Sequence, residues 1–291
     1  MNASRTEKLL FIAPAIAYLL VFSIFPLIYS VGISLTDLNV VRKGTGNFVG
    51  LSNYVHLFSS GSLFVRAVTN TFIIMFFALL IEIVLGFIIA RLFYLVRSVR
   101  FVTILRTMYI IPIMITPLIF GLVWSYVLNP LLGVGNVMLK AAGLHALPWL
   151  GSPKTALATI VMIDVWQWTP FLMMLIFSGF MTIPHELFEA AEVDGARLVK
   201  KITHIELPFL KQVIGLALIL RSMDVFRMFD LIYATTQGGP GGATEVISMF
   251  AYRQSFNYYN TSIGSTASII ALIIITIISN FFNKITKETR G

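Results

Sequence analysis

The feature that most limits the fold of this chain is a series of apolar stretches, each long enough to cross a bilayer. The chain has 291 residues, of which 57% are hydrophobic and 12% charged, whereas about a quarter of a soluble domain is charged. A bilayer core takes about 20 apolar residues of helix. We therefore predict an all-α integral membrane protein, a single transmembrane domain over 1–291. Its six predicted transmembrane helices cover about 9–34, 70–95, 102–127, 155–181, 209–234 and 262–283.

Lysine and arginine are distributed unequally between the segments that join these stretches, and cytoplasmic segments carry the excess. Thirteen of the 21 basic residues fall on one side, which predicts that both termini and the 182–208 segment are cytoplasmic in a multi-pass inner-membrane protein. These thirteen are Arg5, Lys8, Arg91, Arg97, Arg100, Arg106, Arg197, Lys200, Lys201, Lys211, Lys284, Lys287 and Arg290.

Composition excludes several kinds of site. The chain has no cysteine, so disulfides and thiolate metal sites are ruled out. His56, His145, His185 and His204 are scattered without ligand spacing, and we predict no metal site. The basic residues do not cluster on a soluble element, and we predict no nucleic-acid partner.

The segment at 182–208 is the most densely charged one between two apolar stretches, and it is longer than a turn needs. Pro184 suits the first turn of a helix, and Asp194-Gly195 suits its end because glycine adopts the left-handed conformation without penalty. Residues 196–204 can form a second short helix, after which Pro208 is expected to set the start of the fifth span. We predict a helical hairpin hinged at Gly195.

The first helix of this hairpin has Leu187, Ala190 and Ala191 at i, i+3 and i+4, which predicts one apolar face of small residues. Such a face allows a partner to approach closely. The alternative is an amphipathic hairpin that lies on the membrane surface.

A longer sequence pattern favours docking onto a partner protein over a position on the membrane surface. Glu189-Ala190-Ala191, Gly195 and Ile205-x-Leu207-Pro208 together resemble the EAA signature loop of the membrane subunits of bacterial ABC importers. In that family this loop is a pair of coupling helices that sits in a cleft of the ATP-hydrolysing subunit. The resemblance implies coupling to an ATPase through Leu187, Glu189, Ala190, Ala191, Asp194, Gly195, Ile205, Leu207 and Pro208. The family often has Thr or Ala where this chain has Glu206.

Further segments resemble the carbohydrate-type permeases of the maltose and glycerol-phosphate branch. They are 48–54, 166–171, 229–233, 236–240 and 252–256. The resemblance implies a sugar substrate, a solute-binding protein, two ATP-binding cassette subunits and a second, different permease, although a homodimer stays open. The large outer-loop insertion of the maltose permease is missing here.

The chain has no phosphate-binding loop of the form Gly-x4-Gly-Lys-Ser/Thr. The glycine-rich turn at 238–242 lacks the following lysine, and no strand precedes it. We therefore predict that the chain is not an enzyme, and that ATP and magnesium are bound by the partner ATPase. The turn lies on the predicted outer side, where Gln237, Gly238, Gly239 and Pro240 are expected to contact the binding protein.

Ionisable residues within membrane spans tend to face an interior or a wet cavity. In the fourth span Asp164, Gln167, Trp168 and Phe171 share one helical face. That face combines polar groups for hydroxyls with flat rings for sugar C–H faces. In the resembled maltose permease the matching positions line the sugar pocket, so we predict a substrate pathway here.

The fifth span presents Arg221, Asp224 and Met228 on a second face, which is also predicted to line the pathway. Two interpretations remain open, because Arg221 with Asp224, and Arg227 with Asp230, could neutralise each other at i, i+3. An arginine left unpaired would suit an anionic sugar. Glu82 in the second span is interpreted as a contact for helix packing or for the second permease.

The predicted function is that of a permease subunit that forms half of the pathway of an ATP-driven sugar importer. One alternative is an ABC importer permease for a non-sugar solute. A secondary transporter would need two related halves with broken helices, and no such repeat is present. A membrane enzyme would need a cluster of histidines and acids at one depth, and the sequence lacks one.

Overall fold

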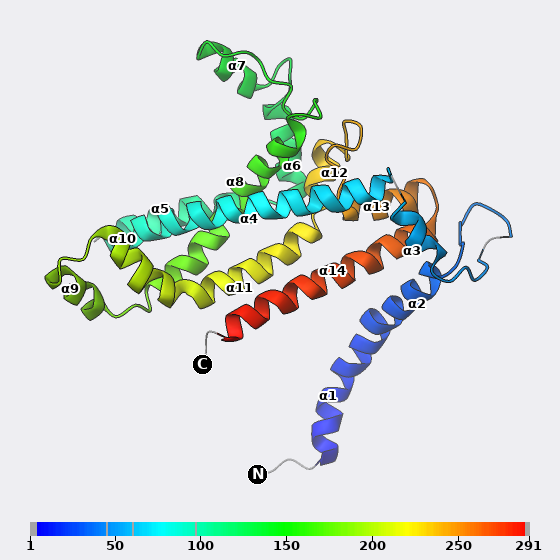
Figure 1. Cartoon of the computed structure of the whole chain (residues 1–291), viewed down its shortest axis with the longest axis horizontal. Helices are drawn as coiled ribbons and strands as arrows, with labels where there is room; N and C mark the ends of the chain where they lie inside the picture. Colours follow the sequence, from blue (N-terminus) through cyan, green and yellow to red (C-terminus); the bar gives the residue numbers. More distant parts are fainter. Residues whose placement is uncertain (1–4, 45, 60, 97, 289–291) are drawn as a thin grey trace. The chain divides into compact units, whose positions relative to one another are not determined.

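The computed structural model of the chain describes residues 5–44, 46–59, 61–96 and 98–288 (Figure 1). Regular structure in these residues is helical apart from one antiparallel bridge between Thr36 and Phe48. The helices are α1 (Arg5–Leu19), the π-helical turn η1 (Leu20–Ile24), α2 (Phe25–Ser34), α3 (Ser52–Leu57), α4 (Leu63–Leu95), α5 (Val99–Met114), α6 (Pro117–Val127), α7 (Val134–Ala141), α8 (Ala156–Phe180), α9 (His185–Val193), α10 (Leu198–Lys201), η2 (Ile202–Glu206), α11 (Leu207–Phe226), α12 (Asp230–Thr235), α13 (Ile247–Tyr252), η3 (Arg253–Asn257) and α14 (Thr261–Glu288).

The chain forms two compact units. The first comprises Met1–Val65 with Phe250–Leu272, and the second comprises Arg66–Met249 with Ile273–Gly291. In the first unit, the Asn53 side chain donates to the Ser34 and Thr36 carbonyl oxygens at 2.8 and 2.7 Å. The second unit contains all the residues predicted to contact substrate or ATPase.

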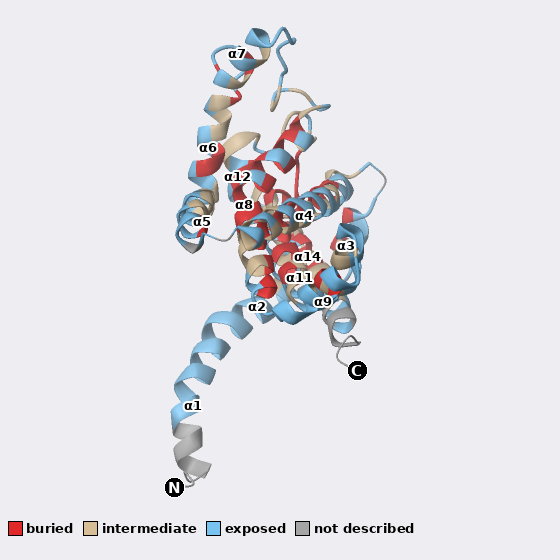
Figure 2. Cartoon of the chain, turned by 90° about the vertical axis from the view of Figure 1, so that its left-hand side faces the viewer, coloured by how far each residue is buried: buried red, intermediate tan, exposed pale blue. Residues whose placement is uncertain are grey.

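Among the described residues, four helices are long and apolar enough to cross a membrane. They are Phe11–Ser34, Leu63–Leu95, Ala156–Phe180 and Thr261–Phe282. Each coincides with a predicted span. The most apolar part of Phe11–Ser34 has no buried residue, so its side chains are free to face lipid or another subunit. Figure 2 shows α1 exposed, apart from its residues that are drawn in grey.

The third predicted span, 102–127, is not one helix. It consists of α5 and α6, whose axes are bent by 92° with respect to each other. The two helices make a fifth crossing only if the pair is counted as a single span. Pro117 disfavours helical geometry at the residue before it, and Thr116 is accordingly extended, with ψ 141°. The Gln167 side-chain amide donates to the Ile115 carbonyl at 2.9 Å, which satisfies an acceptor freed by the break.

The fifth predicted span, 209–234, is also divided. It consists of α11, a break over residues 227–229, and the short helix α12. Asp230 lies in the first turn of α12, where a negative charge is favourable. Helix α11 is not among the four long apolar helices, and it carries Lys211, Arg221 and Asp224 in 20 residues.

Helix α8 is the centre of the second unit, and its buried side chains lie on most of its circumference (Figure 2). It packs against α5 and α11, while α12 packs against α6. Glycines allow the closest approaches. A Cβ on Gly86 of α4 would lie 3.1 Å from the Met173 backbone nitrogen, and one on Gly179 would lie 2.6 Å from Leu210 Cδ2. Small residues allow membrane helices to pack closely in this way.

Candidate functional site

Three ionisable side chains from three helices meet inside the second unit. Arg221 of α11 donates from Nη2 to Glu82 Oε1 at 2.9 Å and from Nε to Glu82 Oε2 at 3.0 Å. Its Nη2 also bonds Asp164 Oδ2 on α8. The side chains of Arg221, Glu82 and Asp164 are 1%, 0% and 2% exposed. Charges so deeply buried persist only with partners, and this charge cluster therefore joins α4, α8 and α11.

The charge cluster bears on two interpretations that the sequence left open. Arg221 pairs with Glu82 and Asp164 rather than with Asp224, and in the described part of the chain no ion pair forms between Arg227 and Asp230. Glu82 is bound within its own chain. The sequence contained a signal for a basic partner of Glu82, since Glu82 is the only ionisable residue of α4 between Arg66 and Arg91. A single acid in a long apolar helix requires a basic partner, and the fifth span contains two arginines.

A polar cavity of about 140 Å³ lies beside the charge cluster. Its lining includes Asp164, Gln167, Trp168, Arg221, Asp224 and Met228, and also Arg227 and Asp230. The guanidinium carbon of Arg221 lies 4.7 Å from the centre of the Trp168 ring. Phe171, predicted on the same face, does not line the cavity and instead packs edge-on against Trp168, with ring centres 6.3 Å apart. Met228 reaches the cavity from the break after α11 and not from a helical face.

Gln167, which lines the cavity, has a side-chain acceptor without a partner in the part of the chain that the structure describes. The residue is 1% exposed, and its Oε1 has no hydrogen-bond partner among the described residues. Buried polar atoms in folded proteins are nearly always bonded. A bound molecule with a hydroxyl group could supply the missing donor. Sequence reasoning identified Gln167 but not its role at the break between α5 and α6.

The hairpin at 182–208 begins with α9, which ends where the sequence predicts. The Ala196 backbone N–H donates to Ala191 O at 2.8 Å, and the Gly195 N–H donates to Glu192 O at 3.0 Å. These are the two bonds of a Schellman motif. The left-handed residue of the motif is Gly195, with φ +65°.

The second half of the hairpin differs from the prediction. It is not a separate helix, because α10, η2 and α11 follow one another without a break and the residues at both junctions, Ile202 and Leu207, are helical. Pro208 therefore lies in the first turn of α11 and does not separate it from the hairpin. The wider π-helical turn before Pro208 gives its ring room that an α-helical interior would deny.

The predicted apolar face of α9 is divided. Ala191 is buried, whereas Leu187 and Ala190 are exposed. Phe188 turns inward instead, and its ring centre lies 5.9 Å from that of Tyr94 on α4. Val193 is 88% exposed. The exposed apolar residues of α9 thus form a surface that this chain itself does not cover.

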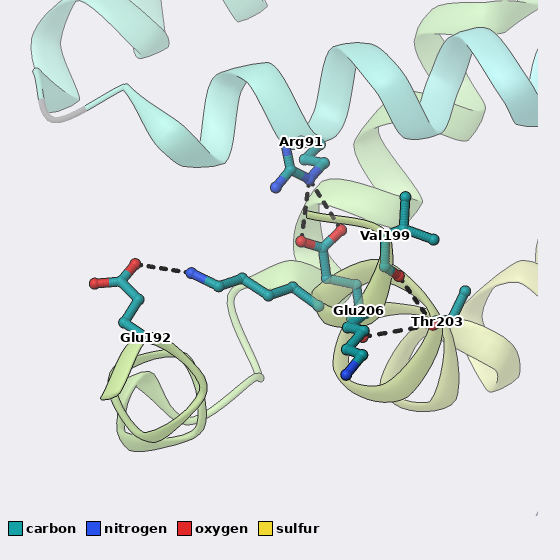
Figure 3. A network of polar contacts seen from close by, with 7 residues as sticks. Arg91, Glu192, Val199, Thr203 and Glu206 are labelled. Atoms are coloured by element: carbon teal, nitrogen blue, oxygen red, sulfur yellow. Dashed lines mark hydrogen bonds and ion pairs between the residues drawn. The ribbon is translucent and has the colours of Figure 1, made fainter. Parts of the chain in front are cut away.

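Two ion pairs hold the hairpin (Figure 3). Arg91 of α4 donates from Nε to both carboxylate oxygens of Glu206 at 3.0 Å. Lys201 Nζ, at the end of α10, donates to Glu192 Oε1 on α9 at 2.9 Å and so connects the two helices. The sequence assigned no role to Glu206. The acid lies two residues before Pro208, and the basic residues predicted on the same side of the membrane could have suggested an ion pair.

Hydrogen bonds from side chains stabilise the glycine-rich turn after α12. The Thr244 hydroxyl donates to the Gly239 carbonyl at 2.6 Å, and Arg66 Nη1 donates to the Gly241 carbonyl at 2.7 Å. Gln237 and Gly238 have positive φ angles of 50° and 83°. The described residues contain no group of three His, Asp or Glu side chains placed to hold a metal ion.

A helical bundle with membrane-length helices, an internal polar cavity and a protruding hairpin defines a membrane transport protein. The chain belongs to the family of binding-protein-dependent transport system inner membrane components, whose profile matches residues 82–287. The matched region contains the charge cluster, the cavity and the hairpin.

Two curated relatives extend over nearly the whole chain. The trehalose/maltose transport system permease protein MalF of Thermococcus litoralis is 37% identical over 278 residues, which are 93% of this chain and 91% of that protein. The arabinooligosaccharides transport system permease protein AraP of Bacillus subtilis is 28% identical over 99% of this chain and 91% of its own length.

A solved structure has the same fold. A chain of a bacterial alginate ABC transporter, crystallised with a periplasmic protein that carries an alginate pentasaccharide, matches with a TM-score of 0.83 and 25% identity. The match covers 98% of this chain and 96% of that one. The likeness therefore extends over nearly the whole length of both chains.

Proposed function

We propose that this chain is the permease subunit of an ATP-driven importer, and that it forms half of the pathway for a sugar or sugar derivative. The observation that carries the proposal is the polar, aromatic cavity at Trp168, in a member of a transport family whose relatives include trehalose/maltose and arabinooligosaccharide permeases. A periplasmic or extracellular binding protein delivers the substrate, and the turn at Gln237–Pro240 is its contact.

In this proposal the chain crosses the inner membrane six times. The bent pair α5 and α6 makes one crossing, and α11 makes another in spite of its ionisable residues, because Arg221 is neutralised by two carboxylates. Both termini are cytoplasmic, as the basic residues predict. Of those residues, Arg97 and Arg290 lie outside the described residues.

The 182–208 hairpin is the proposed coupling element. It docks through the exposed apolar surface of α9, which includes Leu187, Ala190 and Val193, into an ATP-binding cassette subunit. ATP and magnesium are bound by that subunit. Two such subunits and a second permease, most simply a different one, complete the transporter.

The cavity favours an uncharged sugar. The cavity lining carries three carboxyl groups, those of Asp164, Asp224 and Asp230, and two guanidinium groups, those of Arg221 and Arg227. Arg221 is already bound to Asp164 and to Glu82 behind the lining, so only Arg227 is left for an anionic substrate, and two carboxyl groups share the lining with it. Carboxylates accept hydrogen bonds from sugar hydroxyls, and Trp168 offers a flat ring to the C–H face.

The test is sugar uptake by the reconstituted transporter with its binding protein. Trp168→Ala should reduce uptake by about tenfold, as loss of a stacking ring worth about 1–1.5 kcal/mol predicts, while the complex still assembles. Trp166→Ala is the matched control, because Trp166 lies on the same helix but is 60% exposed and outside the polar cavity. Equal uptake by both variants contradicts the proposed pathway.

The charge class of the substrate is tested by competition. A neutral disaccharide should compete for uptake, and an oligosaccharide of uronic acids should not. Preferential uptake of the acidic oligosaccharide contradicts the assignment of an uncharged sugar. Recovery of a non-sugar solute from the co-purified binding protein contradicts the sugar assignment as a whole.

A further inference from the structure

We infer that the ion pair between Arg91 and Glu206 is the joint that transmits movement of the 182–208 hairpin to α4. This rests on the proposed function of the hairpin as the coupling element. Arg91 and Glu206 act here as positioning residues, since neither lines the substrate cavity.

The geometry of the pair is that of a rigid connection. One nitrogen of Arg91 is shared equally by the two carboxylate oxygens, both at 3.0 Å. The side chain of Glu206 is 2% exposed and that of Arg91 is 19% exposed. Water therefore screens the pair little. The other ion pair of the hairpin differs, because its Glu192 is 72% exposed, and exposed pairs contribute little.

The position of Glu206 between the hairpin and α11 determines which helices the ion pair connects. Glu206 is the last residue of η2, and the helix continues from it into α11 without a break. A displacement of the hairpin therefore moves α11 directly. Without the Arg91–Glu206 pair, the end of α4 nearest the hairpin would be linked to it by apolar contacts that can slide, and the nearest ion pair to α11 would be the one at Glu82.

A second ion pair joins α4 to the same continuous helix further along. Glu82 on α4 binds Arg221 on α11, whereas Arg91 on α4 binds Glu206 at the end of η2, so the acid is on α4 at one joint and on the partner helix at the other. On α4 the two joints lie about 13 Å apart along the axis, at 1.5 Å per residue. Two such joints favour one register of the helices, because a slipped register would leave buried charges without partners.

The first half of the hairpin contacts the same end of α4. Tyr94, one turn beyond Arg91, has its ring centre 6.0 Å from that of His185 and 5.9 Å from that of Phe188, both on α9. Both halves of the hairpin thus meet the last turn of α4, but only the second half is bound to it by charge. Figure 3 shows Arg91 reaching from α4 to Glu206.

The experiment measures ATP hydrolysed per sugar transported in the complete reconstituted transporter. Arg91→Gln and Glu206→Gln should each raise this ratio by roughly tenfold, within the usual range of coupling between sites. Arg106→Gln is the matched control. It removes an arginine from the same predicted side of the membrane, but Arg106 lies over the Phe177 ring at 5.8 Å and forms neither of the hairpin's ion pairs.

A second arm uses the absence of cysteine from this chain. In Arg91→Cys/Glu206→Cys a short bifunctional thiol reagent can join only these two positions. The untreated protein should be uncoupled, and cross-linking should return the ratio to that of the wild type. Because both states are measured on one preparation, a folding defect cannot imitate this result.

Two results overturn the inference. One is an unchanged ratio in Arg91→Gln and Glu206→Gln transporters that assemble normally. The other, which decides the matter if those variants do not assemble, is a ratio in the double cysteine variant that is the same with and without the cross-link. Failure of the proposed function is distinguishable, because the wild-type transporter itself would then move no sugar.

Discussion

Replacing Arg221 by methionine should destabilise the protein severely. Methionine keeps the length and the apolar stem of the side chain but leaves Glu82 and Asp164 buried without a cation. Removal of one partner from a buried ion pair costs about 3–5 kcal/mol. Both remaining carboxyl groups were bound to the same guanidinium, so without it they cannot both stay ionised and at least one takes up a proton.

That loss is large in comparison with the total stability of a domain, which is about 5–15 kcal/mol. The measurement is equilibrium unfolding of the purified protein in mixed micelles, followed by circular dichroism. In Arg221→Met/Glu82→Gln/Asp164→Asn all three charges are removed, and a buried ionic group replaced by neutral ones is often neutral in stability. The triple variant should therefore recover most of the loss.

Arg106→Met serves as the control for losing an arginine. Its guanidinium stacks on a single ring at 5.8 Å, and the expected loss is about 0.5–1 kcal/mol. The reasoning is refuted if Arg221→Met is as stable as Arg106→Met. It is equally refuted if the triple variant is no more stable than Arg221→Met alone, since the cost would then not come from unpaired charge.

Three further outcomes are expected. Gly195→Val should uncouple ATP hydrolysis from uptake, because a left-handed φ costs a residue with a side chain about 1–2 kcal/mol. The protein should still insert, because nothing else lies within 4 Å of the new Cβ. A normal ratio of uptake to hydrolysis contradicts this. Gly86→Ala should lower the free energy of unfolding by about 1–3 kcal/mol through overpacking, since the Cβ would meet backbone at 3.1 Å, and micellar unfolding measures it. The Gly46 N–H, which donates to Asp37 Oδ1 at 2.7 Å, holds the pKa of Asp37 below its ordinary value. Its contribution to loop order is thus present at neutral pH and is lost as pH falls through that lowered pKa, and amide-exchange protection of Gly46 should decrease there in the wild type but not in Asp37→Asn.

Sequence patterns located the long apolar helices where composition alone decides. Four apolar stretches became four long helices, and the end of α9 at Asp194-Gly195 followed from the chemistry of glycine. The pattern was less informative where a helix stops within an apolar stretch. Pro117 signalled the break between α5 and α6, but prolines also lie inside continuous helices, as Pro170 does in α8.

The candidate site was predicted in its members but not in its partnerships. Asp164, Gln167, Trp168, Arg221 and Asp224 line the cavity from two helical faces, and Met228 lines it from the break after α11, whereas Phe171 does not line it. The partner of Arg221 could not be found by local spacing, because Glu82 is 139 residues away in the chain. The same holds for Arg91 and Glu206, which are 115 residues apart.

The sequence by itself therefore determined that this is a helical membrane protein of a transport family with a glycine-terminated hairpin. These properties depend on the hydropathy of short segments and on the local geometry of the backbone. Only the tertiary structure decided which acid neutralises which arginine, which residues the broken helices bring to the cavity, and that the hairpin continues into α11. Such features depend on how helices distant in the sequence pack, because a buried charge bonds the partner that packing brings within reach.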